Sequence, residues 1–147
     1  NDEGLRFESA RKLGFKELIN ASKVDVVQEI LKMTNQSGAD IVIECSGAAS
    51  AINTSIDILR KHGRMCVIGI PGDELIKFKW KKAVFKAINV IFHFSSSSTS
   101  WSKVLDLIDS KSLDVKSLIT CIADMDEWED IFTKVGEGKV LKAVLRP

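Results

Sequence analysis

Two small-residue turns are the parts of this sequence whose composition could form a binding site. The first, Glu44-Cys45-Ser46-Gly47, follows the apolar run Ile41–Ile43, and the second, Gly69-Ile70-Pro71-Gly72, follows Met65–Ile68. Glycine has no Cβ, so it lets another group approach the backbone closely. Short apolar runs without polar alternation are typical of strands covered on both faces, as in parallel sheets. Since ligands bind outside the carboxyl ends of such strands, we predict a binding site at the two turns.

The segment between the two runs has the spacing of an amphipathic helix, with Ile52, Ser55, Ile56 and Leu59 on one face. The unit is therefore strand, helix, strand, with strands over Ile41–Ile43 and Met65–Ile68. Before it, we expect a helix from Leu5 to Leu13 ended by Gly14, and a short strand at Glu17–Ile19. A second helix follows, capped by Ser22 and carrying its apolar stripe from Val27 to Thr34.

After the second turn, Leu75–Phe78 alternates as an edge strand would. The serine-rich run Ser95–Ser100 could be a flexible linker, but we favour a strand-to-helix loop with Ser100 as the helix cap. Residues Lys111–Cys121 look irregular. The other expected elements are helices at Trp80–Ala87, Trp101–Ile108 and Met125–Val135, and strands at Val90–Phe94 and Val140–Leu145.

Alternating strands and helices predict the α/β class, with a doubly wound parallel sheet. The sequence contains no G-x-G-x-x-G turn and opens on a helix, whereas a Rossmann sheet opens on a strand followed by that turn. We therefore expect a partial Rossmann sheet that lacks its first two strands, which would leave a backbone edge unpaired. The sequence accordingly predicts part of a longer polypeptide.

Composition narrows the possible partners. The 147 residues carry 21 basic and 20 acidic side chains, so charge gives no reason to expect nucleic acid or an anionic membrane. No apolar run nears the roughly 18 residues of a membrane span, and the start has no signal-peptide pattern. Three cysteines without a C-x-x-C pair favour reduced thiols in the cytoplasm and argue against a zinc site built from this chain alone. We expect Cys45 and Cys66 to be small buried hydrophobes.

Several segments, in order and at matching spacing, carry a resemblance to a known family. They are Arg6–Gly14, Gly38–Gly47, Gly63–Gly72, Leu118–Thr120 and Gly138–Leu145. Through them the whole chain resembles the C-terminal part of the medium-chain dehydrogenases, specifically the zinc-containing alcohol and polyol dehydrogenases such as sorbitol and threonine dehydrogenases. The resemblance implies that residues 1–112 are the later part of the NAD(P)-binding Rossmann domain. Residues 113–147 would return to the catalytic, GroES-like domain.

The resemblance also implies which residues hold the cofactor. Asn1 stands where relatives carry an acidic residue that binds the adenosine ribose, and Arg6 would lie beside it. The side-chain amide of Asn1 carries no negative charge to repel a 2′-phosphate, so the cofactor could be NAD or NADP. Cys45, Ser46 and Gly47 match the turn that passes a ribose. Backbone groups of Ile68, Gly69 and Ile70, and of His93 and Phe94, match the nicotinamide contacts, and Lys142 matches a basic residue near the pyrophosphate. Each of these roles has a simpler alternative. The two turns would be ordinary strand-to-helix connections, His93 would be a structural residue, and Arg6 and Lys142 would be solvated surface side chains.

The activity implied by the resemblance is reversible hydride transfer between a small alcohol or polyol and NAD(P), with zinc as a Lewis acid. No catalytic residue or zinc ligand is expected in this chain, which by itself would be inactive. Alternatives are a zinc-free quinone reductase of the same superfamily and a non-catalytic α/β module that binds a nucleotide or a partner. The segment Leu75–Phe78 corresponds to the strand through which relatives form homodimers or homotetramers; its plain alternative is an edge protected by lysines.

Overall fold

The computed structural model describes residues 4–147, so the prediction for Asn1 lies outside the described residues. The chain divides into two compact units. One contains the residues up to Leu18 together with Ser96–Pro147, and the other contains Ile19–Ser95. Each unit has its own parallel sheet, in agreement with the predicted α/β class.

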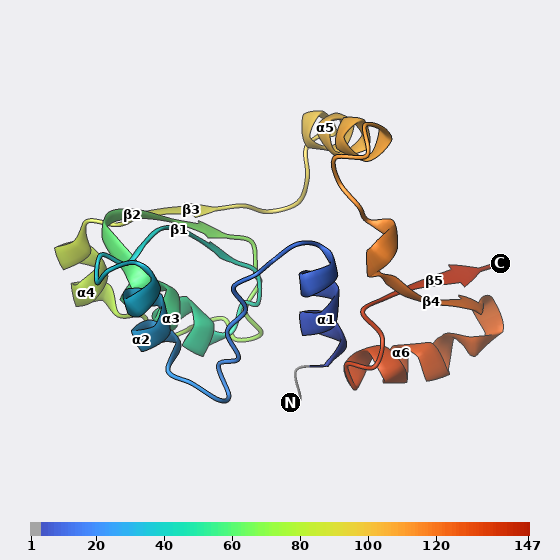
Figure 1. Ribbon diagram of the computed structural model, residues 1–147, viewed down its shortest axis with the longest axis horizontal. Coiled ribbons are helices and arrows are strands. Elements are labelled where there is room, and N and C mark those ends of the chain that lie inside the picture. Colours follow the sequence, from blue (N-terminus) through green and yellow to red (C-terminus); the bar gives the residue numbers. More distant parts are fainter. Residues whose placement is uncertain (1–3) are drawn as a thin grey trace. The chain divides into compact units, whose positions relative to one another are not determined.

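The unit Ile19–Ser95 contains a three-stranded parallel sheet in the order β1-β2-β3 (Figure 1). The strands are β1 (Ala39–Glu44), β2 (Leu59–Val67) and β3 (Asn89–Phe92). The outer edge of β1 pairs with no strand among the described residues. Because consecutive strands run parallel, a crossover helix must return the chain each time. Helix α3 (Ala49–Ile58) joins β1 to β2, and α4 (Trp80–Lys86) lies between β2 and β3.

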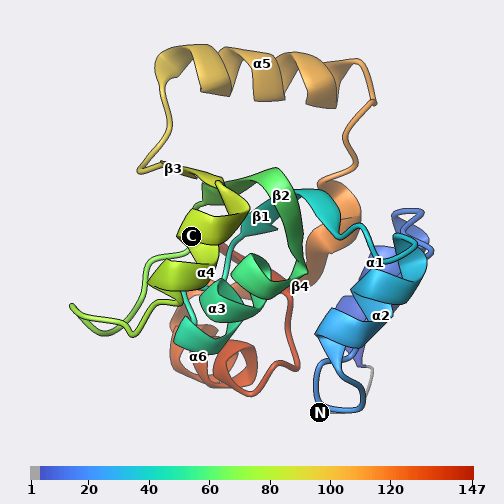
Figure 2. The same cartoon turned by 90° about the vertical axis from the view of Figure 1, so that its left-hand side faces the viewer.

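Both crossover helices lie on the same face of this sheet, as Figures 1 and 2 show. The core forms under them from Ile52 of α3 and from Leu59, Met65 and Val67 of β2. On the opposite face, Ile41, Ile43 and Ile91 are about half exposed. Residues 19–95 are all described, and they place no helix on that second face. The sequence predicts helices on both faces of the sheet, but within this unit they cover only one face.

Helix α2 (Val26–Met33) packs beside α3. Its cap is Asp25, whose carboxylate accepts hydrogen bonds from the backbone of Val27 and Gln28. The prediction of Ser22 as the cap is wrong because the chain first makes a turn, in which Ser22 donates to Asn20. An aspartate satisfies the exposed N–H groups of a first helical turn as well as a serine does.

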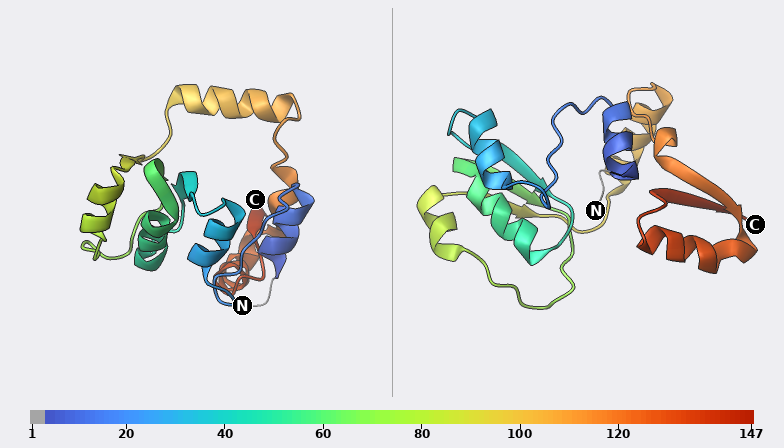
Figure 3. Two further views of the ribbon diagram at one scale, coloured as in Figure 1. Left: turned by 60° about the vertical axis from the view of Figure 1, so that its left-hand side comes forward. Right: turned by 60° about the horizontal axis from the view of Figure 1, so that its bottom comes forward.

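The other unit combines α1 (Leu5–Lys12), α5 (Ser98–Asp109) and a two-stranded parallel sheet. The strands β4 (Ile119–Asp124) and β5 (Lys142–Arg146) are joined by α6 (Trp128–Gly136), which packs against both (Figure 3, right). Two short 3-10 turns, Lys116–Leu118 and Met125–Glu127, flank β4. Part of the segment predicted to be irregular is therefore a strand, because Ile119–Asp124 finds a partner in β5 more than twenty residues later.

The extended segment Leu75–Phe78 is not a strand, contrary to the prediction. A side chain, not a strand, meets the backbone here. Asn53 on α3 donates from Nδ2 to the Lys77 carbonyl at 2.8 Å and accepts from the N–H of Lys79, just after the segment, at 3.0 Å. The alternation itself is real. Ile76 and Phe78 pack against the core, whereas Leu75 is 88% exposed.

Other differences from the predicted elements are local. The segment Glu17–Ile19 forms no strand, because no neighbouring strand in the described chain supplies a ladder for it. Strand β2 begins at Leu59, which was predicted to lie on the preceding helix, and β3 ends at Phe92 before His93 and Phe94. Only Ser95–Ser97 of the serine-rich run form the predicted loop, because α5 already begins at Ser98. Ser97 rather than Ser100 is the cap, since its Oγ accepts from the Ser100 N–H. Among the described residues, no helix is long and apolar enough to cross a membrane.

Candidate functional site

The carboxyl ends of the three strands in the unit Ile19–Ser95 are aligned in register. Glu44, the last residue of β1, pairs with Val67 of β2, and Val67 pairs with Phe92 of β3. Backbone hydrogen bonds continue past the strands: Ile68 and Gly69 donate to the Glu44 carbonyl at 2.8 and 3.0 Å, and His93 donates to the Val67 carbonyl at 2.9 Å. The structure therefore brings the three predicted segments, Cys45–Gly47, Ile68–Ile70 and His93–Phe94, to one edge of the sheet.

Glu44 is a buried carboxylate within this edge, with only 4% of its surface exposed. Its Oε1 accepts hydrogen bonds from the Ser46 N–H at 2.8 Å and the Ser46 hydroxyl at 2.5 Å, and the Gly47 N–H lies 3.1 Å from both carboxylate oxygens. Burial acts to raise the pKa of Glu44, but the hydrogen bonds from Ser46 and Gly47 together outweigh it and lower the pKa below its ordinary value. The side chain is therefore an anion at neutral pH.

The sequence reasoning placed Glu44 in the turn and gave it no role. A signal for it was present. An acidic residue at the end of an otherwise apolar strand, followed directly by serine and glycine, has N–H and hydroxyl donors within reach of its carboxylate. A charge in that position is buried at a high cost unless such donors satisfy it.

Two glycines at this edge have no room for a side chain. At Gly47, whose φ is +70°, an added Cβ would overlap with the backbone of Ile70 and Pro71. At Gly69 it would overlap with the backbone of Ser46 and Gly47 and with the carboxylate of Glu44. The two turns are thus in backbone contact, and glycine is required where they meet.

The surface around the turns is apolar and accessible. Ile70 is 72% exposed and Phe94 is 87% exposed. Exposed apolar side chains beside backbone N–H and C=O groups suit a flat, mostly neutral ring that also makes a few hydrogen bonds.

Two cysteine predictions are wrong. Cys45 is exposed, because it lies in the turn after β1, and Cys66 is partly exposed, because it faces the side of the sheet away from α3 and α4. Two further predicted site residues lie in the other unit: Arg6 on α1 and Lys142 at the first position of β5. In residues 4–147, no three or more histidine, cysteine or acidic side chains form a group that could hold a metal ion.

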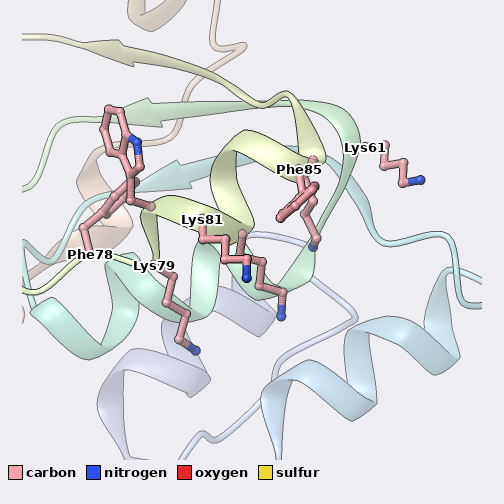
Figure 4. A pocket seen from close by; sticks show the side chains of 8 residues that line it. Lys61, Phe78, Lys79, Lys81 and Phe85 are labelled. Atoms are coloured by element: carbon pink, nitrogen blue, oxygen red, sulfur yellow. The ribbon is translucent and has the colours of Figure 1, made fainter.

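A separate concave surface of about 680 Å³ lies around α4 (Figure 4). It is lined by Lys61, Phe78, Lys79, Trp80, Lys81, Lys82, Phe85 and Lys86. Lys79 and Lys82 form ion pairs with Asp57 at the end of α3, and Lys86 donates to the carbonyls of Ile56, Asp57 and Leu59. Three of its five lysines therefore attach α4 to the carboxyl end of α3, which gives this basic surface a structural explanation.

Comparison with known proteins identifies the family. Residues 2–110 match the model of a family described as zinc-binding dehydrogenase. The chain belongs to the zinc-binding dehydrogenase family. Its resemblance to the alcohol and polyol dehydrogenases of the medium-chain type is confirmed, and so is the fold class. The division predicted near residue 112 and the roles of single residues stay predictions.

Individual relatives agree with the family. A sorbitol dehydrogenase of Halalkalibacterium halodurans is 31% identical over 147 residues, which is all of this chain and 43% of that protein. An L-threonine 3-dehydrogenase of a Shewanella species is 30% identical over 141 residues, covering 95% of this chain and 41% of that protein. An alcohol dehydrogenase structure from Thermus sp. ATN1 superposes with a TM-score of 0.90 over 97% of this chain and 41% of that chain, at 22% identity. The chain thus spans about two fifths of the length of these zinc-binding dehydrogenases.

Proposed function

We propose that this chain forms the cofactor-holding part of an NAD(P)-dependent alcohol or polyol dehydrogenase. One observation supports this above all: in a zinc-binding dehydrogenase, the carboxyl ends of three parallel strands are aligned at Glu44, Val67 and Phe92, each followed by a turn. That edge is where open α/β sheets bind their ligands. The relatives named for sorbitol and L-threonine favour a small hydroxylated substrate.

The family resemblance suggests a role for each turn. Ser46 and Gly47, after β1, would contact a ribose, and Cys45 would lie beside them. The backbones of Ile68, Gly69 and Ile70, after β2, would hold the nicotinamide carboxamide, and those of His93 and Phe94 would make a further contact with the nicotinamide. Arg6 would lie beside the position that contacts the adenosine ribose. Lys142 would lie near the pyrophosphate, for which a cationic side chain is suited.

When bound, the nicotinamide would supply the hydride acceptor, and zinc, whose ligands the resemblance places outside this chain, would supply Lewis acidity. The contribution of this chain is to orient the ring and exclude water around it. On its own it would bind a nicotinamide cofactor without turning over an alcohol. We also propose a cytoplasmic location, which the three free cysteines support.

The test is a fluorescence titration of the purified protein with NADH and NADPH, in wild type and two glycine variants. Gly69→Ala puts a methyl group into the contact between the turns, so the Kd should rise by about tenfold or more. Gly72→Ala is the matched control, because nothing lies within 4 Å of its added Cβ, and its Kd should stay unchanged. Saturable wild-type binding weakened only by Gly69→Ala supports the function, and equal effects of the two variants would contradict it.

A further inference from the structure

The turn after β1 contains three successive backbone N–H groups that would ordinarily form an anion site. They belong to Ser46, Gly47 and Ala48, immediately before helix α3, where Ala48 is the N-cap. Successive N–H groups at the start of a helix attract phosphates and other anions, since they point the same way and the helix dipole adds to them. Here all three are already bound within the chain.

Two of the three N–H groups are bound by a carboxylate from the strand itself. The Ser46 and Gly47 N–H groups donate to Glu44 at 2.8 and 3.1 Å, and the Ala48 N–H donates to the Ser46 hydroxyl oxygen at 3.1 Å. We propose that Glu44 is an internal anion that fills this site and thereby positions the turn to accept a neutral ribose hydroxyl rather than a phosphate. The part of this inference that concerns the cofactor rests on the proposed function.

The serine hydroxyl explains the selectivity for a hydroxyl group. An ionised carboxylate has no proton to give, so in the 2.5 Å contact with Glu44 the Ser46 O–H is the donor. One lone pair of Ser46 Oγ accepts from Ala48, and the other remains for a ligand. A group that can only accept can bind the O–H of a ribose but not an ionised phosphate oxygen.

Glu44 also joins this turn to the next one. Its backbone carbonyl accepts from Ile68 and Gly69, and its Oε2 lies only 2.5 Å from where a Cβ on Gly69 would be. A change in this one side chain should therefore affect both the turn after β1 and the turn after β2. Glu44 is a positioning residue, since it acts through Ser46, Gly47 and Gly69.

The experiment compares wild type with Glu44→Ala, Glu44→Gln and the control Glu74→Gln, which changes an exposed carboxylate in a loop. Amide resonances of Ser46, Gly47 and Ala48 are followed by NMR during titration with sodium formate and with sodium sulfate. In Glu44→Ala the emptied site should bind formate, which shifts these resonances toward their wild-type positions. Wild type and Glu74→Gln should show no saturable shift there.

The second readout is the NADH affinity of the same proteins. Glu44→Gln keeps the size of the side chain but replaces a charged acceptor by an amide, so its Kd should rise about tenfold. Formate should restore the affinity of Glu44→Ala and leave that of wild type unchanged. If Glu44→Ala does not fold, the formate titration is made during its refolding, where recovery of folded protein supports the proposal.

Two results would overturn the inference. One is saturable binding of sulfate or formate at Ser46–Ala48 in wild type, because the site would then be open. The other is a Glu44→Gln variant with wild-type amide positions and NADH affinity. If formate fills the site in Glu44→Ala but NADH does not bind even the wild type, the anion assignment stands and the proposed function fails.

Discussion

Gly47 lies so close to the carbonyl of Ile70 that a Cβ at residue 47 would overlap with it. The contact joins the turn after β1 to the turn after β2, and Gly47 also has a φ of +70°. Gly47→Ala should therefore combine backbone strain with a clash and lower the free energy of unfolding by about 3 kcal/mol. Urea denaturation measures the loss.

Gly14→Ala separates the two contributions. Gly14 has a φ of +92° but nothing within 4 Å of an added Cβ. Gly14→Ala should therefore lower the free energy of unfolding only by the strain of a left-handed residue, about 1 kcal/mol. Equal losses for the two variants would show that the turns are not in contact.

Asp57 should support stability against acid. Burial acts to raise the pKa of Asp57, but hydrogen bonds and charges from Lys79 and Lys82 outweigh it, so the folded-state pKa lies below the unfolded one. A lowered carboxylate pKa stabilises the protein above the unfolded pKa of about 3.9, and that contribution is lost as the pH falls through the folded pKa. Urea unfolding of wild type and Asp57→Asn should differ by about 1 kcal/mol at pH 7, and the difference should shrink below about pH 4. If the difference in unfolding free energy between wild type and Asp57→Asn stayed constant with pH, the stabilising role of the Asp57 ion pairs would be contradicted.

Leu75 should mediate self-association. It is 88% exposed, on the outer side of a segment whose Ile76 and Phe78 pack inward. Leu75→Asp should convert dimers or tetramers into smaller species in sedimentation velocity, since burying a carboxylate between copies is unfavourable. Val24→Asp, at another exposed apolar position, is the control. An unchanged sedimentation coefficient for Leu75→Asp would exclude this segment as the interface.

Cys45 offers a chemical probe of the turn after β1. Its thiol is exposed, whereas Cys66 and Cys121 are partly buried. With NADH at ten times its Kd, iodoacetamide should alkylate Cys45 about tenfold more slowly, because only about a tenth of the protein is free. Peptide mass spectrometry gives the rates, and Cys121 in the other unit is the internal control. Alkylation of Cys45 that ignores NADH would place the cofactor elsewhere.

Much of the central unit could be predicted from sequence, because its signals are local. The apolar runs Ile41–Ile43 and Met65–Ile68 marked the strands, and Ile52, Ser55 and Ile56 marked the helix that covers them. Strand β4 was missed, since Ile119–Asp124 becomes a strand only by pairing with a distant segment. The extended segment at Leu75–Phe78 was mistaken for a strand because Asn53, rather than another strand, meets its backbone.

The meeting of the turns at one edge of the sheet was predicted, but the way in which Glu44 connects them was not. The glycines at 47 and 69 pointed to the edge at which the turns meet, since strand ends in parallel sheets coincide. The serine and glycine after Glu44 indicated donors for its carboxylate, but the burial of this side chain also depends on Gly69, which follows the next strand. The exposure of Cys66 likewise depends on which face of the sheet the helices cover.

The most direct measurement is NMR mapping of NAD binding on the isotope-labelled protein. If the aligned strand ends hold the cofactor, the largest amide shifts will occur at Ser46, Gly47, Gly69, Ile70 and His93. Residues near the opposite ends of the strands, such as Gly38, Lys61 and Asn89, should stay in place. Shifts concentrated at those opposite ends or around the lysines of α4, with the three turns unchanged, would contradict the account.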